Sequence, residues 1–359
     1  GTNSGVTQPV VDVVIPVHTD RRPISRATAS VLSTATAPAR VTVVCHNVDP
    51  AAIASVLGPW SDDPRVRLLH LADGIPSPAG PINAGLDAAT GEFTALLGSD
   101  DEYEPGAIDA WVATARRDDA HIVIPPLRST PGGPTRSPPT RIGRTRALDG
   151  VRDRLAYRTV QLGLVSRERF GHLRMTTGLR SGEDVIQGAS LWYSDARISR
   201  VRRGPGYLIN SDDTDRTSTS TKPAAESLRF LDAVLAPEFT GTLTPAQRES
   251  FAVKLLRTHI MDILGASLRA GGSAADVAAL GDAVGRILGL APSAASIVSL
   301  GEARVLAALR DGADAERLTA QRRVLTDFRR LPNVVPASAG RLLHREAPLR
   351  FLAATAFMR

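Results

Sequence analysis

The first hundred residues alternate short apolar runs with segments of helical spacing, and this alternation limits the fold more than any other feature. The apolar runs, rich in β-branched residues, occupy positions 10–17, 41–45, 66–71 and 92–98. The segments of helical spacing between them are 24–35, 51–60 and 79–90. Apolar runs of this kind predict strands buried on both faces, and their alternation with helices predicts a mostly parallel sheet with helices on both sides. The chain is therefore expected to have an α/β fold.

Polar residues follow three of these predicted strands. They occupy positions 18–20, 46–49 and 99–102. Ligands of open α/β sheets bind beyond the carboxyl ends of the strands, so polar groups at several strand ends predict one shared ligand site.

The second half of the chain has a different pattern. Residues 127–154 are rich in Pro, Gly and Ser, which predicts a long, mobile loop, and a strand and two helices are expected between 157 and 193. From about Ala224 onward, the periodicity is that of amphipathic helices. We therefore expect two domains, 1–222 and 223–359, of which the second is entirely helical.

Composition excludes several classes of protein. Cys45 is the only cysteine, so the chain can form neither an intrachain disulfide nor a thiolate metal cluster. The net charge of +6 comes almost wholly from Arg, and the few aromatic residues sit mainly in apolar segments, which argues against nucleic-acid binding. No apolar run reaches the roughly 18 to 20 residues of a membrane-spanning helix, and residues 1–10 do not resemble a signal peptide, so a cytoplasmic protein is expected.

An acidic turn, LLGSDDEYEP, follows the last predicted strand of the first half. Adjacent carboxylates at Asp100 and Asp101 are costly to hold together unless a cation shares them, and Mg²⁺ favours one or two carboxylates together with phosphate oxygens. Asp residues also cap helix N-termini, and a helix is expected from about Pro105. The turn alone leaves both interpretations open.

A second carboxylate pair, Glu183 and Asp184, precedes the apolar helical segment that contains Trp192. Such a pair can supply a general base. It can equally cap the helix, with Asp184 or Ser181 at the N-cap position. Spacing favours core packing for Trp192 and Tyr193 over contact with a sugar.

Taken in order, VVIPVH, PINAGLDAATGEFTALLGSDD, LGLVSRERF, SGEDVIQGASLWY and YLINSDDTDRTS resemble family 2 of the GT-A glycosyltransferases over roughly residues 10–220. The resemblance implies a bacterial, inverting enzyme that uses a nucleoside-diphosphate sugar and Mn²⁺ or Mg²⁺. It implies Asp184 as the catalytic base and Asp100 and Asp101 at the metal. The implied donor-binding residues are Pro16, Val17, His18, Asn47, Asn83, Ser99, Asp100 and Arg216.

Three departures from the family pattern affect the donor site. CHNVDP stands where the family commonly has an acidic pair, which leaves the donor base open. Gly98 stands at the usual first Asp of the metal turn, and Ile82 stands where an Arg often precedes the helix Asn. Arg216 is the candidate to replace that Arg charge.

The expected acceptor is a glycan, a polyol phosphate or a lipid-linked molecule, since Arg136, Arg141, Arg144 and Arg146 in the predicted loop could meet phosphates. The Arg-rich segment 322–359 suits either contact with the inner face of a membrane or packing against the helices or a second subunit. The rival functions are a catalytically silent nucleotide-sugar or glycan-binding protein of the same fold and a nucleotidyltransferase. The loop HTDRRP lacks the Gly-rich pattern of the latter.

Overall fold

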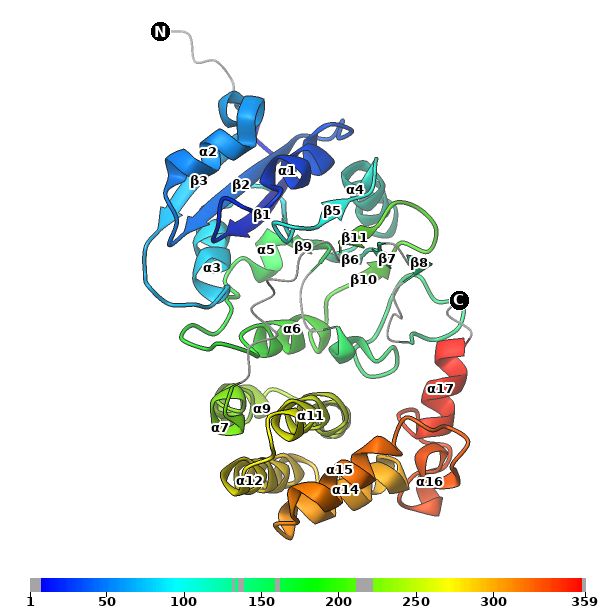
Figure 1. Ribbon diagram of the computed structural model, residues 1–359. Coiled ribbons are helices and arrows are strands. Elements are labelled where there is room, and N and C mark those ends of the chain that lie inside the picture. The colour runs from blue at the N-terminus through cyan, green and yellow to red at the C-terminus, as the bar shows by residue number, and fades with distance from the viewer. Residues whose placement is uncertain (1–7, 131–132, 135–138, 159–161, 211–221, 357–359) are drawn as a thin grey trace, which may run out of the picture.

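The computed structural model describes residues 8–130, 133–134, 139–158, 162–210 and 222–356. An α/β region lies above a helical region in Figure 1. The α/β region confirms the predicted fold class, with a seven-stranded sheet of order β10-β6-β9-β4-β1-β2-β3. Its strands are β1 (Val11–Val17), β2 (Ala39–His46), β3 (Val66–Leu71), β4 (Phe93–Leu96), β6 (Ile122–Ile124), β9 (Leu164–Ser166) and β10 (Ile198–Arg200).

Strand β1 lies inside the sheet and sets its register. Val13 pairs with Val41 of β2 and with Ala95 of β4, both in parallel. Only β9 runs antiparallel to its neighbours, β4 and β6. Because the carboxyl ends of β1, β2 and β4 share one edge, the predicted strand-end cluster forms there.

Helices cover both faces of the sheet, as its alternating side chains require. Val13 and Ile15 pack into a cluster with residues of α1, α2 and α4, whereas Val14 packs on the opposite face with residues of α3. The helices of this region are α1 (Ile24–Leu32), α2 (Pro50–Leu57), η1 (Gly58–Asp62), α3 (Ala79–Asp87), α4 (Ala107–Asp118), α5 (Arg167–Phe170) and α6 (Val185–Trp192). Trp192 lies in the core, as expected.

The prediction that residues 127–154 form one long loop is wrong in part. A second sheet of order β5-β11-β7-β8 contains β7 (Leu127–Ser129) and β8 (Gly133–Pro134) from this segment, together with β5 (Glu102–Tyr103) and β11 (Tyr207–Ile209). Farther along, Asp153 is buried and bonds to Arg141, just before η2 (Leu155–Tyr157). Pairing with the distant strand β11 holds β7 in place, and local composition cannot reveal such a contact.

The chain after residue 222 is helical, which confirms the predicted C-terminal region. Its elements are α7 (Ala224–Ser227), α8 (Leu231–Val234), α9 (Pro237–Thr240), α10 (Pro245–Lys254), η4 (Leu255–Ile260), α11 (Met261–Arg269), α12 (Ala274–Leu290), α13 (Ala294–Ile297), α14 (Leu300–Arg310), α15 (Ala315–Arg323), α16 (Leu331–Val334), η5 (Ala339–Arg341) and α17 (Pro348–Ala356). The π-helical turn η4 joins α10 to α11 without a break. Within the described residues, no helix is both long and apolar enough to cross a membrane.

One hydrophobic core joins the two regions. Val185 and Ala189 of α6 belong to the same buried cluster as Phe230 and Phe251 of the helical region. At the junction, Gly182 adopts φ +76°, and a Cβ there would lie 2.6 Å from the Phe230 ring. The turn that carries Glu183 and Asp184 therefore rests directly on the helical region. The boundary at 222/223 stays a prediction, as it adjoins residues outside the described set.

This contact predicts different outcomes for two glycines with the same backbone angle. Gly178 also has φ +76°, but a Cβ there meets nothing within 4 Å. Gly178→Ala should lower the free energy of unfolding by about 1 to 2 kcal/mol, the cost of a left-handed residue with a side chain. Gly182→Ala should lower it by a further ~1 to 3 kcal/mol through overpacking against Phe230. Urea unfolding of both variants measures the difference, and equal losses would contradict the contact.

Candidate functional site

A cavity of about 410 Å³ opens at the carboxyl ends of β1 and β4. Four of the residues predicted for the site line it: Pro16, Asp100, Asp101 and Asp184. Glu183 also lines it, and α3 contributes Ile82. The structure thus brings the two carboxylate pairs, more than 80 residues apart in the sequence, to one cavity.

Asp101 is fixed by β11 and the residue that follows it. Its Oδ2 accepts a hydrogen bond from the Tyr207 hydroxyl at 2.6 Å, and its Oδ1 accepts one from the Asn210 backbone N–H at 3.0 Å. The Tyr207 hydroxyl in turn accepts a bond from the Gly98 N–H at 3.0 Å. Burial and the charge of Asp101 raise the pKa of Tyr207 well above its usual value, so the hydroxyl stays protonated as a donor.

Asp100 is held by the loop that follows β1 and by α1. Arg22 Nη1 lies 2.7 Å from Asp100 Oδ2, and the Arg22 side chain is only 6% exposed. The Asp100 carbonyl accepts bonds from Arg26 Nη2 at 2.9 Å and from Asn210 Nδ2 at 3.1 Å. Several elements therefore fix the acidic turn, and a buried guanidinium lies beside its first carboxylate. Since Arg22 also lines the cavity, it can meet an anionic ligand there.

The surroundings of Gly98 indicate whether the acidic turn has room for a divalent cation. A Cβ built on Gly98 would lie 2.8 Å from Asp101 Oδ2 and 3.2 Å from Asp100 Oδ1. Oxygens of both carboxylates thus converge over a residue without a side chain, and the usual Asp of the family would crowd them. Within the described residues, no group of three or more His, Cys, Asp or Glu side chains could hold a metal. Two carboxylates with phosphate oxygens and water are a ligand set that Mg²⁺ accepts, so Asp100 and Asp101 could hold such an ion if a diphosphate supplied further ligands.

Glu183 and Asp184 lie side by side but in different surroundings. Asp184 occupies the N-cap position of α6, yet its side chain makes no capping hydrogen bond. This observation weakens the interpretation of Asp184 as a simple helix cap. Burial, together with the charge of Asp184, raises the pKa of Glu183. Glu183 is therefore harder to ionise than an exposed glutamate.

The helical region places a buried cation near this pair. Lys254 is 2% exposed, its Nζ donates to His259 Nε2 at 2.6 Å, and the charges of Asp184 and Asp262 attract its ammonium form. Burial lowers the pKa of Lys254 to about 7, although those two carboxylates oppose the shift. Burial and the Lys254 charge lower the pKa of His259, which keeps its ring neutral and able to accept.

The other residues predicted to bind the sugar donor are not among the described residues that line the cavity. The Val17 side chain is buried in the core, and Ser99 is also buried. His18 is exposed. Asn47, with φ 53°, accepts at Oδ1 from the Gly74 N–H at 2.9 Å. Their roles in nucleotide binding stay predictions.

The amide of Asn83 has a structural partner. Its Oδ1 accepts from the Met175 N–H at 2.8 Å, and its Nδ2 donates to the Met175 carbonyl at 3.0 Å. Asn83 thereby positions Met175, which lines the cavity. Arg216 lies outside the described residues.

Sequence reasoning did not single out Arg22, Tyr207, Asn210 or Lys254. The pair of arginines in HTDRRP, directly after a predicted strand, was a usable signal for Arg22. Lys254 was detectable as one of only two lysines, placed within an apolar helical segment. The bond from Tyr207 to Asp101 spans 106 residues and leaves no local pattern.

Comparison with known proteins gives a consistent result. The family model "Glycosyl transferase family 2" matches residues 12–175, a range that includes Asp100 and Asp101 and ends before Asp184. Succinoglycan biosynthesis protein ExoO of Rhizobium meliloti (strain 1021) is 34% identical over 119 residues, which cover 32% of this chain and 32% of that protein. The match thus spans about a third of the curated relative.

Solved structures of S. aureus TarS share the fold. Residues 1–349 of TarS in complex with UDP-GlcNAc give a TM-score of 0.73 at 15% identity, covering 88% of this chain and 90% of that chain. A longer TarS structure gives a TM-score of 0.69, with 55% of that chain covered. The similarity extends over both the α/β region and most of the helical region, and it confirms the GT-A fold.

The buried Lys254 predicts a pH dependence of stability. Its pKa is about 7 in the folded protein and ordinarily near 10.5, so the unfolded chain binds more protons between these values and stability should rise with pH across that window. Lys254→Met should remove a slope of up to about 1.4 kcal/mol per pH unit. Urea unfolding between pH 7 and 9 measures it, and Lys222→Met, at the only other lysine, is the matched control. Identical slopes in all three proteins would show that Lys254 is not buried as a neutral amine.

Proposed function

Residues 12–175 belong to glycosyl transferase family 2, and from this premise we propose that the chain transfers a sugar from a nucleoside-diphosphate donor to an acceptor hydroxyl. One observation carries the proposal. Asp100 and Asp101 share a single cavity with Asp184, at the strand ends where α/β sheets bind ligands. A donor-binding group and a candidate base are therefore close enough to act on one substrate pair.

Asp184 is the proposed general base. It takes the proton of the acceptor hydroxyl while the oxygen bonds to the anomeric carbon, and the bond from that carbon to the diphosphate breaks. Attack from the face opposite the diphosphate gives inversion. Two features support Asp184 over Glu183: it makes no capping bond, and burial raises the pKa of its neighbour.

The acidic turn and Arg22 form the proposed diphosphate site. Asp100 and Asp101 would hold Mn²⁺ or Mg²⁺, which offsets charge on the departing diphosphate when it is bound. Arg22 adds a cation at the cavity wall, 2.7 Å from Asp100. The Tyr207 and Asn210 contacts keep Asp101 in place without a ligand, so this half of the site is preorganised.

The relatives indicate which substrates to test. The TarS structure contains UDP-GlcNAc, so we propose a uridine-diphosphate sugar as the first donor. The ExoO name refers to polysaccharide synthesis, which supports a glycan acceptor, with a polyol phosphate or lipid-linked molecule as the alternatives. We place this reaction at the cytoplasmic side of the cell, and a homo-oligomer is a further proposal. The competing function is silent nucleotide-sugar or glycan binding on the same fold.

Replacing the proposed base tests the reaction. Asp184→Asn should lower acceptor-dependent release of nucleoside diphosphate by about 10² to 10⁴, because a positioned base contributes that much. Donor binding should stay within a few-fold of the unaltered protein, since the acidic turn is untouched. A coupled assay with a panel of nucleotide sugars and glycan acceptors measures release, and calorimetry measures binding.

Glu183→Gln is the matched control, because it removes a neighbouring carboxylate from the same cavity. It should retain far more activity than Asp184→Asn. Transfer that survives Asp184→Asn, or that is lost equally in both variants, would reject Asp184 as the base. Absence of any transfer, with donor still bound, would favour the silent binding protein. The anomeric configuration of the product, read by NMR, tests inversion.

A further inference from the structure

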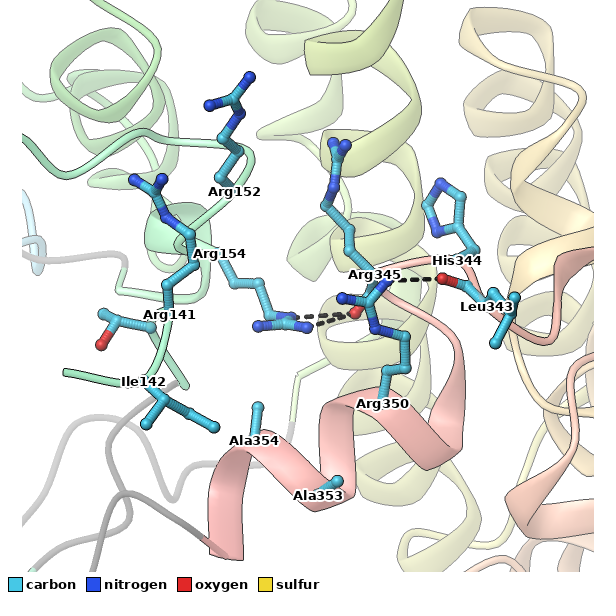
Figure 2. Close-up of a pocket in the computed structure, with 11 residues that line it drawn as sticks. Arg141, Ile142, Arg152, Arg154, Leu343, His344, Arg345, Arg350, Ala353 and Ala354 are labelled. Carbon is cyan, nitrogen blue, oxygen red and sulfur yellow. Dashed lines mark hydrogen bonds between the residues drawn. The ribbon is translucent and has the colours of Figure 1, made fainter. Parts of the chain in front are cut away.

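A second cavity, of about 600 Å³, lies between the segment 140–154 and the C-terminal residues 343–354. Figure 2 shows arginines on both of its walls. Arg141, Arg152 and Arg154 come from the first segment, and Arg345 and Arg350 come from the second. No acidic side chain is among the described residues that line it. Five guanidinium groups around one cavity create a strongly positive potential there.

Only one of these arginines has a direct carboxylate partner in the described part of the chain. Arg141 Nη2 lies 2.8 Å from Asp153 Oδ2. Arg154 is buried and donates to backbone carbonyls instead, at Arg345 and at Pro139. Carbonyl acceptors satisfy its N–H groups, and the buried carboxylate of Glu346 partly offsets its charge. Burial lowers the pKa of Arg154, and the nearby Arg350 and Arg345 act in the same direction.

The remaining three arginines are open to a ligand. Arg350 donates from Nη1 to the Leu343 carbonyl at 2.7 Å. For the guanidinium groups of Arg152 and Arg345, no described residue provides a hydrogen-bond or ion-pair partner. Arg guanidinium groups that line one cavity are suited to phosphate oxygens, which they bind through charge-assisted hydrogen bonds.

Aliphatic side chains around this cavity indicate where the phosphate comes from. Among the described residues, the large apolar side chains that are exposed are Ile75, Ile142, Phe328, Leu331, Leu342, Leu343 and Leu349. All except Ile75 belong to position 142 or to the segment 328–349. Leu343 is 80% exposed and Ile142 is 68% exposed, and both line the cavity. Exposed leucine adds nothing to the binding of a soluble phosphate, whereas it can be buried among the acyl chains of a lipid surface.

Helix α17 separates this cavity from a second one, which polar and apolar residues line together. Arg350, Ala353 and Ala354 face the arginine-lined cavity, while Phe351 and Leu352 line a neighbouring cavity of about 430 Å³. The arrangement places one cation, Arg350, beside the apolar side chains of Phe351 and Leu352 on one short helix. Amphipathic helices at membrane surfaces combine the same two features.

We propose that the arginine-lined cavity binds headgroup phosphates of anionic phospholipids and docks the α17 end of the protein on a membrane surface. Arg345, Arg350 and Arg152 meet the phosphates, and Ile142 and Leu343 enter the boundary between headgroups and acyl chains. Membrane contact was one of the two interpretations of the Arg-rich segment 322–359. The proposal assigns that contact to the cavity between the segments 140–154 and 343–354. The inference does not depend on sugar transfer, so it can fail or hold independently.

Co-sedimentation with lipid vesicles tests the proposal. The full chain should sediment with vesicles of phosphatidylcholine mixed with phosphatidylglycerol, should not sediment with phosphatidylcholine alone, and should be released as salt is raised. Arg345→Gln should lower the partition coefficient about fivefold, since each Arg near an anionic surface contributes about 1 kcal/mol. Leu343→Ser should lower it through loss of apolar insertion.

Arg317→Gln is the matched control, because Arg317 is an exposed residue in the first turn of α15, away from the cavity lining, and its loss changes the net charge equally. It should leave the partition coefficient unchanged. Equal losses in Arg345→Gln and Arg317→Gln would overturn the proposal in favour of nonspecific attraction. Equal binding to both vesicle types would also overturn it.

Displacement from vesicles by inorganic phosphate at the concentration of the lipid phosphate would assign the cavity to a soluble anion instead. Thermal unfolding of each variant confirms that the fold is intact.

Discussion

The hydrogen bond between Tyr207 and Asp101 is the contact on which the candidate site depends. It joins the turn after β4 to β11, and through the Gly98 N–H it also fixes the backbone beneath both carboxylates. Arg22 holds the neighbouring Asp100 from the other side. Two like charges at the end of a buried strand repel each other, so each requires its own donor. The protein supplies these donors from two separate segments, the loop after β1 and the strand β11 with the residue that follows it, and both carboxylates line the cavity.

The helical region supports the other half of the site. Phe230 packs beneath Gly182, and the charge of Asp184 acts on the buried Lys254. The turn that carries Glu183 and Asp184 is therefore positioned by residues beyond position 222. In physical terms the two regions form one unit around the cavity, because a shared hydrophobic core connects them. Substitutions in the helical region are thus expected to shift the position of Asp184, even where the substituted residue does not contact the substrate.

Sequence reasoning predicted the parts of the fold that local pattern determines. The apolar run 66–71 became the strand β3 at the predicted position, although β3 is an edge strand in which only Val66 is buried. The carboxyl ends of β1, β2 and β4 share one edge, as predicted. Asp184 was placed in the site by resemblance, since spacing alone could not connect it with Asp100. The strand β7 was missed because β11, its partner, lies about 80 residues away. Asn83 was expected at the nucleotide, and its amide holds Met175, which only the tertiary structure reveals.

Titration calorimetry shows whether the acidic turn forms a metal-assisted diphosphate site. UDP, GDP and TDP are titrated into the protein with and without Mn²⁺, and the series is repeated on Asp101→Ala. We expect that one nucleotide binds, that Mn²⁺ strengthens its binding, and that Asp101→Ala removes this metal effect. Binding of no nucleotide, or binding that neither Mn²⁺ nor Asp101→Ala alters, would contradict it.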